Sequence, residues 1–172
     1  LRVQSKIKVL RIIARMNVGG PAVQITNLMR GLDPNIFDQK LITGYCEQNE
    51  TDYLELNAPE IPCTRIKGFG RRVSLKEDFL AFFYLAREIK KFKPDYVINC
   101  IGFVKQKIKK TTKLSQVLYI NNYFPKKIFQ ITKTLNIKLL HFSTDCVFDG
   151  KKGNYNEKSN TNAKDLYGFS KY

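Results

Sequence analysis

The residues best suited to chemistry lie near the carboxyl end of the chain, where Tyr167 is followed four positions later by Lys171. If this segment is helical, both side chains lie on one face, because residues i and i+4 are neighbours on a helix. A phenol has a pKa of about 10, so a cation that favours the phenolate brings it closer to the range useful for acid–base catalysis. Thr144 follows an apolar run, and its hydroxyl can hydrogen-bond a substrate carbonyl while Tyr167 transfers the proton. This combination predicts a carbonyl reductase site that takes hydride from a nicotinamide.

The Tyr-x-x-x-Lys spacing is not specific by itself. Tyr123 and Lys127 have the same spacing, and Pro125 between them predicts the start of a helix. The Tyr167–Lys171 pair is the stronger candidate for a catalytic pair because of the residues that precede it. An apolar strand-like run, Ser-Thr-Asp, a polar loop with glycines and Tyr-Gly-x-Ser-Lys follow one another in the order that the chemistry needs.

Residues from about 94 to 172 resemble extended short-chain dehydrogenase/reductases, in particular the dTDP-4-dehydrorhamnose reductases and related nucleotide-sugar epimerases. The resemblance implies catalytic roles for Thr144, Tyr167 and Lys171, with Tyr167 and Lys171 also contacting the cofactor. It further implies that the loop after the strand at 96–101 lies against NADP or NAD, through Asn99, Cys100 and Gly102. The segments that carry the likeness are KPDYVINCIG at 93–102, YINN at 119–122, HFSTDCVFDG at 141–150 and YGFSK at 167–171.

Alternating apolar runs and amphipathic segments predict a Rossmann-like, doubly wound α/β fold with a mainly parallel sheet of about five strands. The expected strands are residues 6–16, 39–45, 60–66, 96–101 and 138–142. The expected helices span 22–32, a segment that starts at the capping box 74–77, and 124–136. Their predicted buried positions are Ala22, Ile25, Leu28, Met29 and Leu32 in the first, Phe79, Phe82, Phe83, Ala86 and Ile89 in the second, and Ile128, Ile131 and Leu135 in the third.

The first strand is followed by Gly19 and Gly20, which permit a tight turn and a close approach of the backbone, and by Pro21, which suits a first helical position. Free amides at such a helix start can hold a phosphate, although a plain strand-to-helix turn explains the residues equally well. A reductase normally has G-x-x-G-x-x-G here. We therefore expect Gly19 and Gly20 to take its place in binding the cofactor.

The amino-terminal half resembles a different class of protein. Residues 8–97 look like the amino-terminal domain of a GT-B glycosyltransferase that uses nucleotide sugars. The segments that carry this likeness are 11–22, 61–71 and 86–97. The basic residues support two origins, since all eight Arg lie at or before Arg87 and 17 of the 22 Lys follow it. We interpret residues 1–172 as one Rossmann-like domain, with a glycosyltransferase-like half at 1–95 and a reductase-like half at 96–172.

Composition restricts the class of protein further. The net charge of +15 is compatible with a solvated basic surface, with attraction of anionic small molecules, or with nucleic acid or membrane binding. Because the lysines are scattered along the chain, a solvated basic surface is favoured. Four separated Cys and one His argue against a zinc site and a disulfide scaffold and favour a reducing, cytoplasmic compartment. No apolar run reaches the ~20 residues that a membrane-spanning helix needs.

The leading hypothesis is therefore an NAD(P)-dependent nucleotide-sugar reductase or epimerase without a metal, for which a homodimer is one assembly to consider. The chain ends one residue after Lys171, so we expect a fragment truncated at the carboxyl end with weak or no activity. The alternatives are a GT-B glycosyltransferase with a nucleotide-sugar donor in surface polysaccharide synthesis, and a basic module that binds nucleic acid or membrane.

Overall fold

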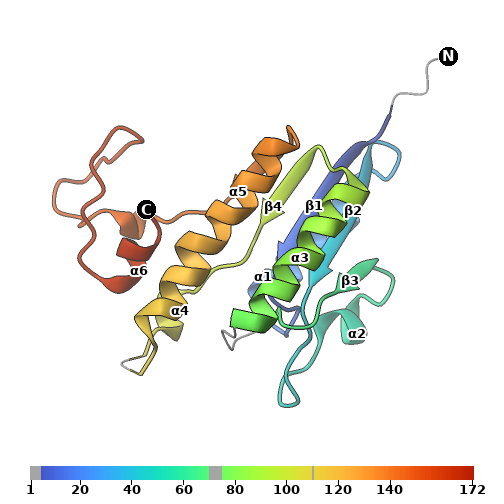
Figure 1. Cartoon of the computed structure of the whole chain (residues 1–172), viewed down its shortest axis with the longest axis horizontal. Helices are drawn as coiled ribbons and strands as arrows, with labels where there is room; N and C mark the ends of the chain where they lie inside the picture. The colour runs from blue at the N-terminus through green and yellow to red at the C-terminus, as the bar shows by residue number, and fades with distance from the viewer. Residues whose placement is uncertain (1–4, 70–74, 110) are drawn as a thin grey trace. The chain divides into compact units, whose positions relative to one another are not determined.

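The computed structural model describes residues 5–69, 75–109 and 111–172, without the side chains of residues 75–78 (Figure 1). The chain divides into two compact units. Unit 1 comprises Leu1–Cys100 and Ile131–Leu140, and unit 2 comprises Ile101–Gln130 and His141–Tyr172.

Unit 1 is built on a five-stranded sheet in the order β3-β2-β1-β4-β5. Figure 1 labels β3, β2, β1 and β4 of this sheet. The pairs β1–β2, β1–β4 and β2–β3 are parallel. The chain starts in the middle of the sheet, adds two strands on one side and then crosses to the other, as in a doubly wound fold. The predicted fold class is thus confirmed. The strands are β1 Ile7–Ile13, β2 Phe37–Thr43, β3 Cys63–Arg65, β4 Tyr96–Asn99 and β5 Lys138–His141.

Both faces of β1 are buried, as expected for a central parallel strand. Ile13 belongs to the core cluster formed with the helix α1 (Gly20–Gly31), whereas Leu10 and Ile12 are fully buried on the alternate face. Arg11 is an exception among these apolar residues, since it is only 3% exposed. Its guanidinium donates a 2.7 Å hydrogen bond to Gln39, and burial lowers its pKa.

The helix α1 buries Ala22, Ile25 and Met29, as predicted. The prediction was wrong for Leu28, which is 49% exposed. Residues 22, 25, 26 and 29 form one stripe at helical spacing, and Leu28 lies about 100° away from Met29 around the axis. Leu32 is half-buried and follows the helix in an extended conformation.

The helix α3 (Leu75–Phe92) buries a different stripe from the predicted one. Ile89 is fully buried as predicted, but its partners are Leu85 and Ala81, four and eight residues earlier. Phe82 and Ala86 are half-buried, whereas Phe79 and Phe83 are 71% and 60% exposed. The helix has more apolar residues than one stripe can hold, so its hydrophobic pattern did not determine which row faces the sheet. The serine of the predicted capping box at 74–77 lies outside the described residues.

A short helix that was not predicted, α2 (Tyr53–Asn57), lies between the expected strands at 39–45 and 60–66. Asp52 begins it by accepting a 2.9 Å hydrogen bond from the Leu54 amide. The same carboxylate contacts Arg65 at 2.5 Å. Burial opposes ionisation of Asp52, but the hydrogen bond and charge of Arg65 outweigh it, and the pKa of this carboxyl is lowered.

The helix expected at 124–136 begins ten residues earlier than predicted. It comprises α4 (Leu114–Leu118), a π-helical turn η2 (Tyr119–Tyr123) and α5 (Phe124–Thr134). Pro125 therefore lies inside a helical run and does not start it. Proline has no amide to donate to the carbonyl four residues earlier, and the π turn directly before it provides the altered hydrogen-bond spacing.

The buried face of α5 differs in part from the prediction. Ile128 is fully buried and Ile131 half-buried, but Leu135 is exposed because it follows the last helical residue. Asn136 has a φ of 55°, the left-handed conformation that commonly ends a helix.

Candidate functional site

The segment with the Tyr-x-x-x-Lys spacing forms the short helix α6 (Leu166–Ser170). Asp165 begins it by accepting a 3.0 Å hydrogen bond from the Gly168 amide, and this hydrogen bond is the main cause that lowers the pKa of Asp165. Tyr167 lies in the helix, and Lys171 is its C-cap residue with φ −98° and ψ −2°. The predicted helical relation between Tyr167 and Lys171 is therefore present.

Gly168 allows α6 to pack directly on the segment that carries Thr144. A Cβ on Gly168 would lie 2.1 Å from the Cys146 carbonyl oxygen and 2.5 Å from the Ala163 Cβ. Cys146 belongs to the short 3-10 helix η3 (Asp145–Val147), which Thr144 begins. Only glycine fits at this contact, so the glycine beside Tyr167 brings α6 against the Thr144 segment.

The Thr144 hydroxyl is held by its own segment. Its oxygen accepts a 3.2 Å hydrogen bond from the Cys146 amide and donates one of 3.2 Å to Asp145. The side chain is half-buried. This hydroxyl can donate to another acceptor only if it turns away from Asp145.

The ammonium group of Lys171 lies at the loop after β4. It donates a 3.4 Å hydrogen bond to the Phe142 carbonyl, and a Cβ on Gly102 would be 3.0 Å from its nitrogen. Desolvation by burial lowers the pKa of Lys171. The structure thus brings together two predicted site residues, Gly102 and Lys171, which are far apart in the sequence.

Asn121 was not among the predicted site residues, although it connects two parts of the site. Its side chain is 3% exposed and lies in the π turn η2. It accepts a 2.7 Å hydrogen bond from the Phe103 amide and donates bonds of 3.2 Å to the Phe103 carbonyl and 2.8 Å to the Ser170 hydroxyl. Asn121 therefore holds the loop beside Gly102 and the end of α6 next to Lys171. The sequence signal that could have identified Asn121 is the YINN segment at 119–122, which contains it.

The other predicted cofactor residues belong to unit 1 and follow the carboxyl ends of adjacent strands. Gly19 and Gly20 follow β1, and Asn99 and Cys100 lie at the end of β4. Asn99 is fully buried, and the Cys100 amide donates a 2.8 Å hydrogen bond to the Ile12 carbonyl. Desolvation by burial raises the pKa of the Cys100 thiol. Parallel strands place these four residues at one edge of the sheet, where doubly wound folds bind ligands.

The chain itself does not require glycine at the turn before α1. Gly19 has a φ of 164°, which is extended backbone, and a Cβ there would meet no atom closer than 3.9 Å. A Cβ on Gly20 would meet nothing within 4 Å. The turn is therefore not the tight left-handed turn for which glycine is needed, and the space beside both residues is open.

A loop that the sequence did not reveal fixes the backbone before this turn. The Val18 amide donates to the Thr51 carbonyl at 3.1 Å, and the Tyr53 amide donates to the Met16 carbonyl at 2.7 Å. An isolated antiparallel bridge joins Asn17 to this segment. The strand-to-helix connection therefore has a defined conformation up to Gly19.

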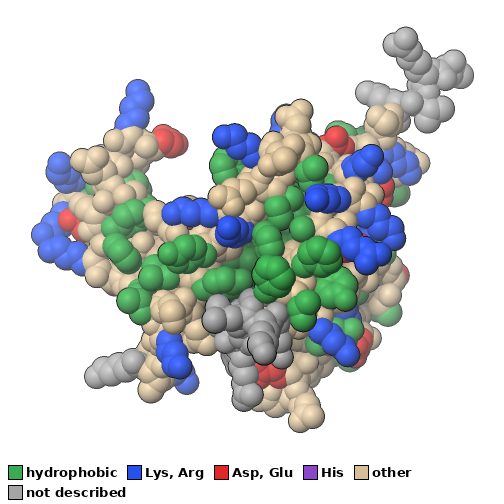
Figure 2. All heavy atoms as spheres, viewed as in Figure 1, with side chains coloured by type: hydrophobic (Ala, Val, Ile, Leu, Met, Phe, Trp, Pro, Cys, Tyr) green, Lys and Arg blue, Asp and Glu red, His purple; other side chains and the backbone are tan. Residues whose placement is uncertain are grey.

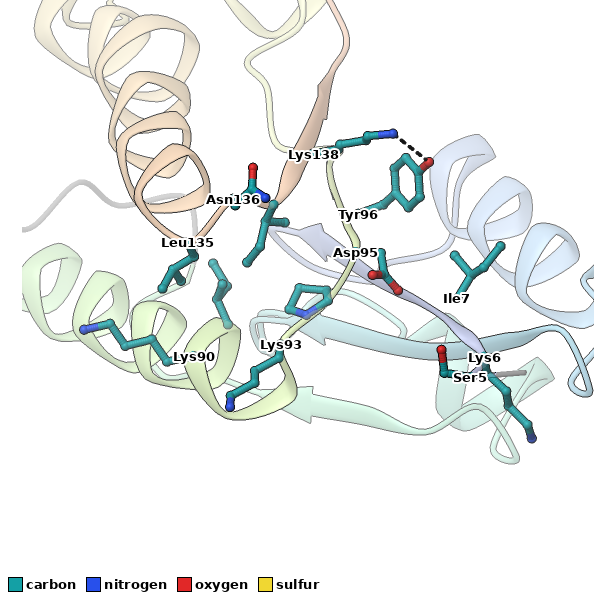
Figure 3. Close-up of a pocket in the computed structure, with 13 residues that line it drawn as sticks. Ser5, Lys6, Ile7, Lys90, Lys93, Asp95, Tyr96, Leu135, Asn136 and Lys138 are labelled. Carbon is teal, nitrogen blue, oxygen red and sulfur yellow. Dashed lines mark hydrogen bonds between the residues drawn. The ribbon is translucent and has the colours of Figure 1, made fainter. Parts of the chain in front are cut away.

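Unit 1 also contains a pocket of about 830 Å³ at the opposite edge of the sheet (Figure 3). It lies beside the amino ends of β1, β4 and β5, and its lining includes Ile7, Tyr96 and Lys138. The predicted cofactor residues of unit 1 follow the carboxyl ends of the strands. The pocket is therefore separate from them.

The described residues contain neither a candidate metal site nor a candidate membrane span. No group of three His, Cys, Asp or Glu side chains in the described part of the chain could hold a metal ion. None of the described helices is both long enough and apolar enough to cross a membrane.

Solved structures of several enzymes share this fold. The ADP-L-glycero-D-manno-heptose-6-epimerase of Helicobacter pylori matches 96% of this chain with 12% identity and a TM-score of 0.67. The enzyme WbmG of Bordetella bronchiseptica, in complex with NAD, matches 99% with 16% identity and a TM-score of 0.65. The dTDP-4-dehydrorhamnose reductase of Bacillus anthracis, in complex with NADP, matches 98% with 20% identity and a TM-score of 0.63.

The chain covers 48% of each of these three structures, so it spans about half of their length. No curated protein sequence matches it. The family of the RmlD substrate binding domain matches residues 50–172, which is well over half of the chain. This match includes the whole predicted catalytic segment and begins within the stretch that resembles a glycosyltransferase. The chain belongs to the RmlD substrate binding domain family.

Proposed function

We propose that this chain is part of an NAD(P)-dependent nucleotide-sugar reductase or epimerase, with Thr144, Tyr167 and Lys171 as its catalytic residues. The observation that carries the proposal is the arrangement within unit 2. Gly168 packs the helix of Tyr167 against the segment of Thr144, while Lys171 lies beside the glycine of the loop after β4. The family match over residues 50–172 and the nicotinamide-bound enzymes that share the fold support the same function.

Each side chain has a separate role in this proposal. The Tyr167 hydroxyl gives a proton to the carbonyl oxygen of the sugar during reduction and takes it back during oxidation. The Lys171 ammonium favours the phenolate form of Tyr167 by its positive charge. The Thr144 hydroxyl turns from Asp145 to the carbonyl oxygen and donates a hydrogen bond to it.

The unit 1 residues fit a dinucleotide at the carboxyl edge of the sheet. The amino end of α1 has no acidic residue in its first turn and no side-chain cap, so its free amides suit a phosphate. The open space at Gly19 and Gly20 permits an outside group to approach the backbone, although the chain itself does not need glycine there. Asn99, Cys100 and Gly102 belong to the loop after β4 that we assign to the same cofactor. When bound, the nicotinamide supplies or accepts the hydride at the sugar carbonyl carbon.

The first experiment is a titration of the purified chain with NADPH and with NADH, followed by nicotinamide fluorescence. We expect saturable binding that Tyr167→Phe leaves nearly unchanged. In a coupled assay with dTDP-4-dehydrorhamnose, where we expect the chain itself to be at most weakly active, the same variant should lose whatever turnover the chain shows, because a general acid usually contributes about 10²–10⁴-fold.

Tyr123→Phe is the matched control, because Tyr123 and Lys127 have the same spacing and Tyr123 is exposed. It should retain both cofactor binding and turnover. Absence of NAD(P) binding in a folded chain would contradict the cofactor assignment. Full turnover by Tyr167→Phe would contradict the assignment of the general acid.

The glycosyltransferase resemblance of residues 8–97 remains an alternative prediction. A glycosyltransferase should transfer sugar from a nucleotide sugar without any nicotinamide, and Tyr167→Phe should not affect this transfer. Gly20→Val should abolish it. A homodimer and a cytoplasmic location also remain predictions, which sedimentation and cell fractionation can check.

A further inference from the structure

The exposed side of α3 combines large apolar side chains with cations. We define the α3 outer face as seven exposed residues of this helix. Four of them are apolar and lie toward the amino end of the helix, and three are cations near its carboxyl end. The members are Phe79, Leu80, Phe83, Tyr84, Arg87, Lys90 and Lys91.

This face lies opposite the stripe that attaches α3 to the sheet. Ala81, Leu85 and Ile89 are buried at successive i+4 positions. The rows that start at Phe79 and Leu80 are turned away from them by the helical repeat of about 100° per residue. Figure 2 shows apolar side chains gathered over α3 with Lys and Arg beside them. Exposed apolar patches of this kind mark binding surfaces more often than single exposed residues do.

The charges on the face have one sign. Glu88 is the one acidic residue between Phe79 and Phe92, and it pairs with Lys40 at 2.5 Å instead of extending the outer face. Arg87, Lys90 and Lys91 therefore add three positive charges to the face. The hydrogen bond to Lys40 is the main cause that lowers the pKa of Glu88, and the charges of Lys91 and Arg87 contribute, so Glu88 offsets only part of this positive charge. The face suits an anionic partner, and the net charge of +15 favours the same partner at longer range.

The lysines of the neighbouring pocket extend outward as well. Lys90 also lines the pocket, together with Lys6, Lys93 and Lys138. Figure 3 shows the side chains of Lys90 and Lys93 extending away from the other labelled residues instead of converging on one point. Diverging ammonium groups match a broad layer of negative charge better than a small enclosed anion.

We propose that the α3 outer face binds an anionic lipid surface, with Phe79, Leu80, Phe83 and Tyr84 entering the headgroup region and the cations contacting lipid phosphates. Helices with an apolar patch and flanking lysines lie in the membrane interface in this way. A second copy of the chain is a poorer occupant, because it would bring the same net charge of +15 against the first. Single-stranded nucleic acid is the other anionic occupant, because bases can stack on aromatic side chains beside cations, and the test below distinguishes it from lipid.

The test uses the absence of tryptophan from the chain. Phe83→Trp places a single fluorescent probe on the outer face, and Leu56→Trp places one at an exposed position of α2 as the matched control. Vesicles of phosphatidylcholine with one-third phosphatidylglycerol should shift the emission of Phe83→Trp to shorter wavelength. Brominated lipid should quench it. The emission of Leu56→Trp should change little, and pure phosphatidylcholine should give no shift with either variant.

Lys90→Gln with Lys91→Gln, in the Phe83→Trp background, should weaken binding to the anionic vesicles by roughly 30-fold, since each lysine near such a surface contributes about 1 kcal/mol. Equal responses of the two tryptophan variants would overturn the proposal, as would equal binding to neutral vesicles. A shift produced by single-stranded oligonucleotide but not by vesicles would assign the face to nucleic acid. A lipid-free emission that is already shifted, in a chain that sediments as a dimer, would assign it to a second copy.

Discussion

Replacement of Gly168 by alanine tests the contact that organises the predicted catalytic segment. The new Cβ would lie 2.1 Å from the Cys146 carbonyl oxygen, whereas Cβ atoms in proteins essentially never come closer than 3.0 Å to another heavy atom. The helix α6 or the segment of Cys146 must therefore move by roughly 1 Å. Overpacking of this kind costs about 1–3 kcal/mol, and a backbone oxygen that cannot rotate away places the cost at the upper end. Alanine recovers about 1 kcal/mol through its helix propensity, so the expected net loss is about 2 kcal/mol.

The assay is urea unfolding of Gly168→Ala beside Gly31→Ala. Gly31 is the last residue of α1 and a Cβ there meets nothing within 4 Å, so this control should gain up to about 1 kcal/mol. For a chain of 172 residues, the expected loss in Gly168→Ala lowers Tm by about 4–8 °C. Turnover should fall as well, because Tyr167 moves relative to Thr144. If Gly168→Ala were as stable as the parent while Gly31→Ala gained stability, the close packing of α6 on η3 would be refuted.

Three further substitutions test the charged groups of the structure. Asp52→Asn should destabilise the chain by about 1–3 kcal/mol at pH 7, because it removes the charge that faces Arg65 while keeping a side-chain oxygen that can still cap α2. The lowered pKa of Asp52 means that this stabilisation is lost as pH falls below 3.8, so urea unfolding in acid should show a smaller difference. Lys171→Met should stabilise the fold by up to about 1 kcal/mol while abolishing turnover. Burial lowers the pKa of Lys171 below 10.5, so the buried charge destabilises the parent chain only while Lys171 is protonated. The stability gained in Lys171→Met should therefore shrink in thermal melts as pH rises toward 10.5. Gln39→Leu should cost about 1–3 kcal/mol because the buried Arg11 loses its acceptor, whereas the double variant with Arg11→Met should regain most of it in the same melts.

The sequence predicted the elements that depend on local patterns. Short β-branched runs indicated all five strands, although β3 is four residues shorter than the expected span at 60–66. The α/β class with a mainly parallel sheet then follows from the alternation of strands and helices, whereas the strand order came from the structure. The relation between Tyr167 and Lys171 could also be predicted, because residues four apart on one helical turn share a face in any helix.

Features that depend on distant residues could not be predicted in this way. The choice of the buried row in α3 is one example, since both of its apolar rows satisfy the helical repeat and only contact with the sheet selects Leu85 over Phe83. The start of the helix at Leu114 is another, because Pro125 is a good local signal for a helix start and the π turn that accommodates it is not visible in the pattern.

The candidate site shows the same division. Its residue types and the order of its segments were determined by the sequence alone. The tertiary structure decided that Gly102 lies at the Lys171 ammonium, that Gly168 meets the Cys146 carbonyl, and that Asn121 connects Phe103 to Ser170. These contacts join residues up to 69 positions apart, and a local pattern carries no information about them because the intervening chain sets the distance.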